Sequence, residues 1–140
     1  MLFGRRERVI KRILIVEDEP LIAFDNEHFL RGEGFEIVAT VDTVPDAIGA
    51  IGQGVDLVLA DVNLSDGGNG RDVASAAKAR KVPLIFVTGA CPTDAQALAM
   101  GCLAKPYSQR DLLAAIETVD AKLAGRPPRR VPKSFTLFGT

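Results

Sequence analysis

The chain has 140 residues, of which 47% are hydrophobic and 25% are charged, and its formal net charge is −1. This length suits one globular domain, and this composition excludes a wholly disordered chain, a collagen-like chain and a small disulfide-stapled protein. The sequence has no apolar run of about 18 residues, which excludes a membrane span, and no apolar signal segment follows its basic start.

The net charge conceals an uneven distribution. Residues 1–12 and residues 125–140 each carry a net charge of +4, which leaves −9 for residues 13–124. An acidic body argues against nucleic-acid binding, because nucleic-acid-binding domains place basic residues on the folded surface. We expect both basic ends to be solvated tails, with binding to an anionic partner surface as the alternative.

The chain has two cysteines, Cys91 and Cys102. They have neither metal-site spacing nor enough partners for a disulfide framework. We therefore expect both to be reduced, small packing groups, and we expect the protein to be cytoplasmic.

Short apolar runs alternate with helix-like stretches along the chain. The apolar runs predict strands at residues 13–16, 37–39, 56–60, 82–87 and 102–104. Because the strongest runs are wholly apolar, we expect them to be covered on both faces, as in a parallel sheet. The stretches between them predict helices at residues 20–32, 44–52, 70–80, 93–100 and 108–123. These βα units indicate an α/β fold with helices on both faces of the sheet, and right-handed crossovers leave a few doubly wound topologies.

The same pattern predicts the domain organisation. Residues 1–11 form a basic N-terminal extension, and residues 12–124 form the one folded domain. Residues 125–140 are basic and proline-rich, and we expect them to form a flexible tail that is too short for a helix-turn-helix domain.

Polar residues follow the predicted strands at their carboxyl ends. Glu17 and Asp18 follow the first strand, and Asp61 follows the third. Thr88 follows the fourth strand and Lys105 the fifth. In an open α/β sheet these ends meet at one edge, which is where ligands bind.

The charge of this group points to a metal ion. Two carboxylates about 5 Å apart repel by roughly 3 kcal/mol at an effective dielectric constant near 20. Three carboxylates and one ammonium leave a charge of −2, which one Mg²⁺ would neutralise with the oxygen ligands it prefers. This donor set suggests phosphoryl transfer with a carboxylate as the nucleophile.

Four segments carry a resemblance to a known family. They are residues 14–20 (LIVEDEP), 57–64 (LVLADVNL), 86–89 (FVTG) and 104–107 (AKPY). In this order, and over about residues 12–123, they resemble a bacterial two-component response-regulator receiver domain of the stand-alone type. The resemblance implies a flavodoxin-like, five-stranded parallel sheet in the order 2-1-3-4-5.

The resemblance also implies roles for the residues at the strand ends. Asp61 is then the phosphoacceptor, and Thr88 and Lys105 bind the phosphoryl group. Mg²⁺ is then held by Glu17, Asp18 and Asp61 and by the backbone carbonyl of Asn63. The Lys105–Pro106 bond is expected to be cis.

A receiver of this kind implies a phosphorelay function. A histidine kinase or a histidine phosphotransfer protein supplies the phosphoryl group, and the receiver catalyses its own phosphorylation and dephosphorylation. The phosphorylated form then switches contacts with a downstream protein target, or passes on or sinks phosphate. Neither nucleic acid nor membrane insertion is expected.

Three features depart from the family pattern. The step of 17 positions from Thr88 to Lys105 is short, so we expect the helix after the fourth strand to be short or partly irregular. Cys102 stands where the family places its switch aromatic, three positions before the lysine. Tyr107 follows Pro106, where an aromatic residue is common, and we expect it to pack.

Residues 83–90 (PLIFVTGA) carry a finer resemblance. They resemble a subfamily of single-domain receivers of alphaproteobacterial general stress signalling, which carry an F-A-T-G-Y motif. Leu84, Val87 and Ala90 depart from that motif.

Other features have simpler interpretations. Residues 61–72 imitate a calcium loop but carry Asp66 and Asp72 where that loop needs Gly and Glu. Residues 67–70 are glycine-rich but lack the lysine of a phosphate-binding loop, so we interpret them as a turn, with Asp66 and Asn69 in turn roles. His28 is interpreted as a solvated or half-buried histidine.

Two other functions compete with the phosphorylated receiver. One is a non-phosphorylated docking module, which the complete set of site residues disfavours. The other is a phosphatase with Asp61 as its nucleophile. Such an enzyme needs a second aspartate two positions later as its general acid–base, and Asn63 at that position argues against it.

Overall fold

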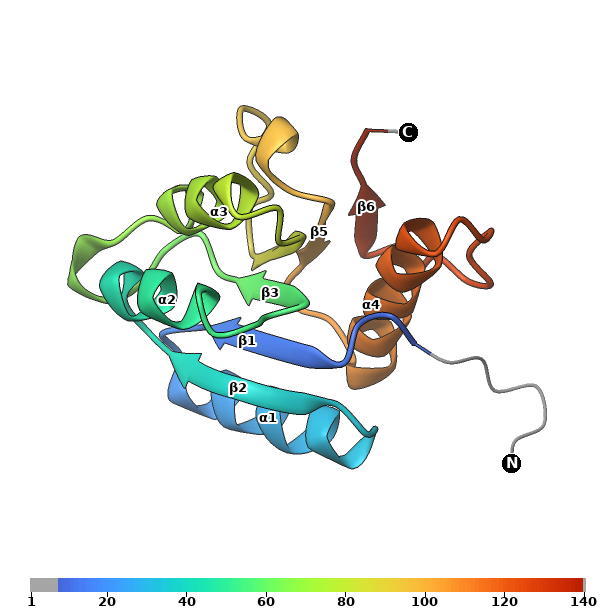
Figure 1. Ribbon diagram of the computed structural model, residues 1–140, viewed down its shortest axis with the longest axis horizontal. Coiled ribbons are helices and arrows are strands. Elements are labelled where there is room, and N and C mark those ends of the chain that lie inside the picture. The colour runs from blue at the N-terminus through green and yellow to red at the C-terminus, as the bar shows by residue number, and fades with distance from the viewer. Residues whose placement is uncertain (1–7, 140) are drawn as a thin grey trace.

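The computed structural model describes residues 8–139 except for the side chain of Asp66. These residues form four α-helices and six strands (Figure 1). The strands are β1 (Arg12–Val16), β2 (Glu36–Val41), β3 (Leu57–Ala60), β4 (Leu84–Thr88), β5 (Gly101–Ala104) and β6 (Phe135–Leu137). The α-helices are α1 (Pro20–Gly32), α2 (Val44–Ile51), α3 (Gly70–Ala79) and α4 (Gln109–Leu123). Of the predicted N-terminal extension, only residues 8–11 lie among the described residues.

The strands form one sheet in the order β2-β1-β3-β4-β5-β6. The first five strands are parallel, so the order 2-1-3-4-5 implied by the family resemblance is confirmed. The sixth strand is antiparallel to β5 and was not predicted.

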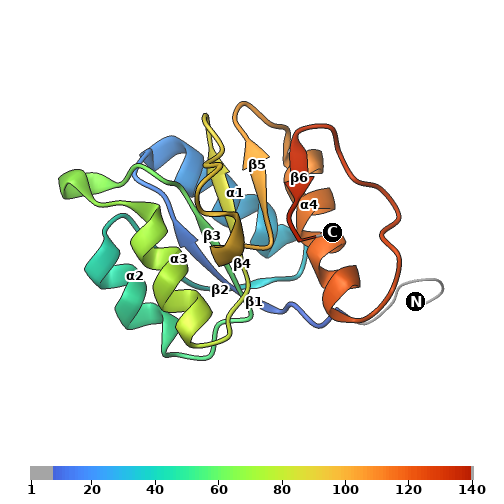
Figure 2. The same cartoon turned by 90° about the horizontal axis from the view of Figure 1, so that it is seen from above.

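The strand side chains alternate between two buried layers. Ile13 and Ile15 of β1 pack with α1 and α4, whereas Leu14 and Val16 pack with α2 and α3 (Figure 2). Both faces of the sheet are thus covered, which explains why the strands are continuous apolar runs.

Capping residues begin three of the helices near the predicted positions. The side chains of Thr43, Asn69 and Ser108 accept hydrogen bonds from the backbone N–H groups of Asp46, Arg71 and Asp111. Such caps satisfy amide groups that have no partner within the helix. No helix of the described residues is long and apolar enough to cross a membrane.

The segment between β4 and β5 departs from the predicted helix over residues 93–100. It contains only a 3₁₀-helix, η2 (Gln96–Leu98). The short connection explains this outcome, because the chain must leave Thr88 and return to the start of β5 at Gly101. The expectation of an irregular segment here is confirmed.

The cysteines form a disulfide bond, so the prediction that they are reduced packing groups is wrong. Cys91 lies three residues after β4 ends, and Cys102 lies within β5, with their Cα atoms 6.0 Å apart. The parallel pairing of β4 and β5 brings the loop back over β5. This pairing joins residues whose spacing alone did not indicate a bond.

The C-terminal segment contains order that the sequence analysis did not predict. Within residues 125–140, β6 pairs with β5 and buries Phe135. Phe138 is also buried, and its backbone N–H bonds the carbonyl of Met100 at 2.8 Å. Gly101 makes room for this strand, because a Cβ there would lie 2.5 Å from the Phe135 ring. The segment predicted to be a flexible tail therefore contains a strand that covers the edge of β5.

Candidate functional site

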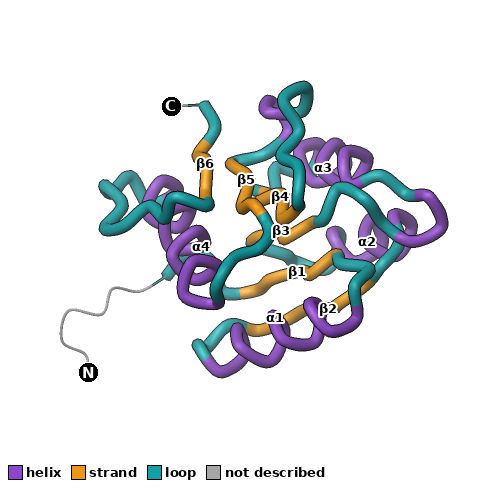
Figure 3. The backbone as a smooth tube through the Cα atoms, turned by 180° about the vertical axis from the view of Figure 1, so that it is seen from behind, coloured by secondary structure: helices purple, strands orange, loops and turns teal. Residues whose placement is uncertain are grey.

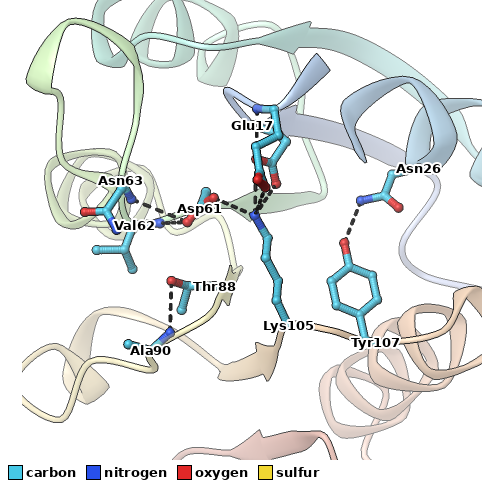
Figure 4. A network of polar contacts seen from close by, with 10 residues as sticks. Glu17, Asn26, Asp61, Val62, Asn63, Thr88, Ala90, Lys105 and Tyr107 are labelled. Carbon is cyan, nitrogen blue, oxygen red and sulfur yellow. Dashed lines mark hydrogen bonds and ion pairs between the residues drawn. The ribbon is translucent and has the colours of Figure 1, made fainter. Parts of the chain in front are cut away.

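The residues predicted from the strand ends meet at one edge of the sheet. Glu17 follows β1, Asp61 follows β3, Thr88 ends β4 and Lys105 follows β5 (Figure 4). Their side chains converge because β1, β3, β4 and β5 are parallel neighbours. Glu17, Asp61 and Thr88 are all buried.

The ammonium group of Lys105 lies at the centre of the site. Its Nζ donates to Asp61 Oδ2 at 2.7 Å and to Glu19 Oε2 at 2.9 Å. It also lies 3.2 Å from Glu17 Oε1. In this arrangement one lysine is the counterion of three carboxylates.

The two oxygens of Asp61 have different environments. Oδ1 accepts hydrogen bonds from the backbone N–H groups of Val62 at 2.7 Å and Asn63 at 3.4 Å. Oδ2 faces the ammonium of Lys105 (Figure 4). The amide bonds orient the carboxylate, and Oδ2 is the oxygen on the lysine side.

Burial and charge shift the pKa values of two site residues. Burial raises the pKa of Glu17 from 4.5 to about 7, against the lowering effect of the Glu19 backbone N–H and the Lys105 charge. Burial alone would lower the pKa of Lys105, but its bonds to Asp61 and Glu19 outweigh this effect and raise it. The lysine is therefore charged, and the site can take up further positive charge.

The backbone positions Thr88 and Lys105 relative to each other. The N–H of Lys105 donates to the carbonyl of Thr88 at 2.9 Å, which extends the pairing of β4 and β5. The hydroxyl of Thr88 accepts from the N–H of Ala90 at 3.4 Å. The Lys105–Pro106 peptide bond is cis, as expected.

The carboxylate group in the structure differs by one member from the predicted metal ligands. Oxygens of Glu17, Glu19 and Asp61 lie within 4.8 Å of one another. Asp18 is half-buried and lies outside this group. Glu19 was missed, although its place in the acidic run after β1, just before α1, was a signal for it.

The remaining singled-out residues have structural contacts. Tyr107 packs against the buried layer between the sheet and helices α1 and α4. Its hydroxyl accepts a hydrogen bond from the buried Asn26 of α1 at 2.8 Å. The sequence analysis did not single out Asn26, whose hydrogen bond to Tyr107 links α1 to the segment after Lys105. His28 is exposed and stacks on Phe24, with ring centroids 6.0 Å apart.

Comparisons with known proteins agree with this geometry. The response regulator receiver domain family matches residues 13–117. The chain is 40% identical to the phyllosphere-induced regulator PhyR of Methylorubrum extorquens over 79 residues, which cover 54% of this chain and 30% of PhyR. The chain spans 30% to 56% of the length of the first curated relatives that it matches.

Solved structures show the same fold. A CheY-like response regulator receiver domain from Methanospirillum hungatei aligns with a TM-score of 0.69 and 30% identity, covering 83% of this chain and 95% of that one. The receiver domain of the Pseudomonas aeruginosa sensor histidine kinase PA1611, which has a magnesium ion coordinated in its active-site cleft, aligns with a TM-score of 0.66 and 26% identity. That alignment covers 78% of this chain and 96% of the PA1611 domain.

The sheet order, the residues at its edge and these matches lead to the same assignment. The five-stranded parallel part of the sheet and the four helices lie within or close to the matched range. The chain belongs to the response regulator receiver domain family.

Proposed function

We propose that this chain is the phosphorylated receiver of a two-component or phosphorelay pathway, with Asp61 as the phosphoacceptor. One observation carries the proposal: a buried carboxylate with one oxygen held by amide groups and the other 2.7 Å from a lysine ammonium. A carboxylate oriented in this way is a suitable nucleophile for phosphoryl transfer.

The oxygen environments suggest which atom reacts. Because Oδ1 is held by Val62 and Asn63, we assign the attack to Oδ2 of Asp61. A bond forms between Oδ2 and phosphorus while the phosphorus–nitrogen bond of a phosphohistidine donor breaks. The leaving imidazole nitrogen keeps the electron pair and takes a proton from solvent.

Lys105 and Thr88 are suited to receive the transferred group. The ammonium of Lys105 already contacts Asp61 Oδ2, so it can pair with a phosphoryl oxygen there. The Thr88 hydroxyl ends the neighbouring strand and can donate to a second oxygen. Preorganised donors of this kind stabilise the charge that develops on the phosphoryl group.

The donor set also fits Mg²⁺. Its members are three carboxylates with Lys105 as their one cationic partner, so a divalent cation can balance the remaining negative charge. We infer that Glu17, Asp18, Asp61 and the carbonyl of Asn63 hold the ion, with Glu19 as a further carboxylate that the structure brings close. When bound, Mg²⁺ neutralises charge on the phosphoryl oxygens.

The phosphoryl donor must reach this edge of the sheet. Leu21 and Phe24 of α1 are 79% and 67% exposed, and α1 begins directly after Glu19. Apolar side chains exposed beside a reactive group favour docking of another protein. We infer a histidine kinase or phosphotransfer protein as donor and a protein target for the phosphorylated form.

The experiment is intact mass spectrometry after incubation with Mg²⁺ and acetyl phosphate. Wild type is expected to gain the mass of one phosphoryl group, and Asp61→Asn is expected to gain none. Asp25→Asn, an exposed carboxylate variant on α1, is the matched control and should behave as wild type. Chelation of Mg²⁺ should abolish the gain.

Two outcomes would contradict the proposal. One is phosphorylation of Asp61→Asn at the wild-type level, which would place the group elsewhere. The other is no gain in wild type with either acetyl phosphate or a phosphorylated histidine kinase, which would favour a docking module.

A further inference from the structure

Residues from both basic segments of the sequence line one groove. Its walls are residues 8–11, the turn at residues 33–35, one face of α4 and residues 126–130. The groove encloses about 1190 Å³. Residues 8–11 precede β1, and the loop between α4 and β6 lies beside α4 (Figure 3). None of the residues that line the groove belongs to the site around Asp61.

A single buried carboxylate holds both ends against α4. Oδ2 of Asp120 accepts from the backbone N–H groups of Val9 at 2.9 Å and Ile10 at 2.8 Å. Its Oδ1 lies 3.2 Å from a guanidinium nitrogen of Arg126. Asp120 is 4% exposed, and its carboxylate is already bonded to Val9, Ile10 and Arg126.

The segment after α4 is pinned on both sides of its prolines. The N–H of Arg126 donates to the carbonyl of Ala121 at 2.8 Å, and the carbonyl of Arg130 accepts from the Thr118 hydroxyl at 3.2 Å. Between these anchors, Pro127, Pro128 and Arg129 form one wall of the groove. The wall is thus a shaped part of the structure.

The groove is cationic although the body of the chain is acidic. Six basic and three acidic side chains line it, a net charge of +3, whereas residues 13–124 carry −9. Among the described residues, three exposed cations of the groove have no ion-pair partner. They are Lys11, Arg110 and Arg129.

The apolar part of the lining favours a protein ligand over a nucleic acid. Leu113, Pro127 and Pro128 offer apolar surface between the cations. The ring of Phe35, the one aromatic side chain in the lining, is covered by the guanidinium of Arg8 at 4.4 Å. No aromatic face is therefore left on which a base could stack, and stacking is a main source of affinity for single strands.

We propose that this groove binds an acidic segment of a partner protein. Carboxylates of that segment pair with Lys11, Arg110 and Arg129, and its apolar side chains lie on Leu113 and the two prolines. The inference does not depend on phosphorylation of Asp61, because the groove shares no lining residue with the site around Asp61.

The test is fluorescence anisotropy with a labelled peptide in which leucines are interspersed among glutamates. Wild type is expected to bind this peptide, more weakly as salt is raised, because salt screens exposed charges. The double variant Arg110→Glu, Arg129→Glu is expected to bind about tenfold more weakly or worse.

The matched control reverses two exposed cations outside the groove, Lys81→Glu and Lys133→Glu, and changes the net charge equally. It should keep the wild-type affinity within about twofold. Far-UV circular dichroism reports that each variant is folded, whatever the outcome of the phosphorylation experiment.

Four results would overturn the proposal. These are an equal loss in both double variants, equal binding of a lysine–leucine peptide, tighter binding of an oligodeoxythymidine of the same charge, and a wild-type dimer that the groove variant dissociates. The third result would assign the groove to nucleic acid and the fourth to a second copy of the chain.

Discussion

At the scale of single residues, the position of Asp61 depends on a glycine that carries no chemistry. Gly70 begins α3, and its N–H donates to the carbonyl of Val62 at 2.6 Å. A Cβ on Gly70 would overlap the carbonyl oxygen of Asp61. Because the neighbouring atoms belong to the backbone, the chain itself would have to move.

We therefore expect Gly70→Ala to lower the free energy of unfolding by about 1–3 kcal/mol, as overpacked sites do. It should also slow phosphorylation of Asp61. Gly49→Ala in α2 is the matched control, because its Cβ meets nothing within 4 Å. That variant should be neutral or more stable by about 0.5–1 kcal/mol, since alanine favours helix over glycine. Urea denaturation measures both, and equal stabilities would contradict this account of Gly70.

At the scale of elements, the segment between β4 and β5 is the least regular part of the domain. It has a three-residue 3₁₀-helix in place of an α-helix, and the disulfide joins its first part to β5. Thr88 lies three positions before Cys91, and Lys105 lies three positions after Cys102. The cross-link therefore joins the loop that follows Thr88 to the strand that precedes Lys105.

Removing the cross-link should destabilise this segment. The double variant Cys91→Ser, Cys102→Ala should unfold at a free energy about 2–3 kcal/mol lower, because a loop of about this length no longer constrains the unfolded chain. A reductant should lower the stability of wild type by a similar amount and leave the variant unchanged. Hydrogen exchange of residues 92–101 should accelerate in both reduced protein and variant. Wild-type stability that is insensitive to reductant would show that the bond does not contribute.

At the scale of the whole molecule, the site couples folding to pH. The pKa of Glu17 is about 7 in the folded chain and about 4.5 when exposed, because burial disfavours its charge. Between these values the folded protein binds more protons than the unfolded one. The stabilisation from this group is complete below pH 4.5 and is lost as the pH rises through 7.

Wild type without Mg²⁺ should therefore lose stability relative to Glu17→Gln as the pH rises from about 5 to 8, by on the order of 1–3 kcal/mol. Denaturation curves of both proteins across this range measure the difference. Mg²⁺ should reduce it, because a bound cation favours the ionised carboxylate. Parallel curves for the two proteins would show that Glu17 titrates normally.

Much of the fold could be predicted because it depends on local pattern. Wholly apolar runs such as residues 13–16 favour strands that are covered on both faces. Thr43 and Ser108 cap the first turns of α2 and α4, which is a local interaction that does not depend on the rest of the fold. The prediction of a helix at residues 93–100 was wrong, because the connection between β4 and β5 is too short to hold one.

The site could be predicted for the same reason. Asp61, Thr88 and Lys105 each end or follow a strand, and the carboxyl ends of parallel strands meet at one edge. Their order along the chain was sufficient to place them together. Glu19 was missed because the proximity of its oxygens to those of Asp61 depends on how the chain turns from β1 into α1.

The tertiary structure alone decided the contacts between segments that lie far apart in the sequence, because no local pattern links such segments. Cys91 meets Cys102 because β4 and β5 pair. Residues 135–137 become a strand because β5 offers an open edge and Gly101 leaves space for Phe135. The sequence analysis predicted solvated tails at both basic ends, because their charge pattern does not show that Asp120 binds them. In the structure Asp120 contacts both Ile10 and Arg126, which are more than a hundred residues apart in the sequence.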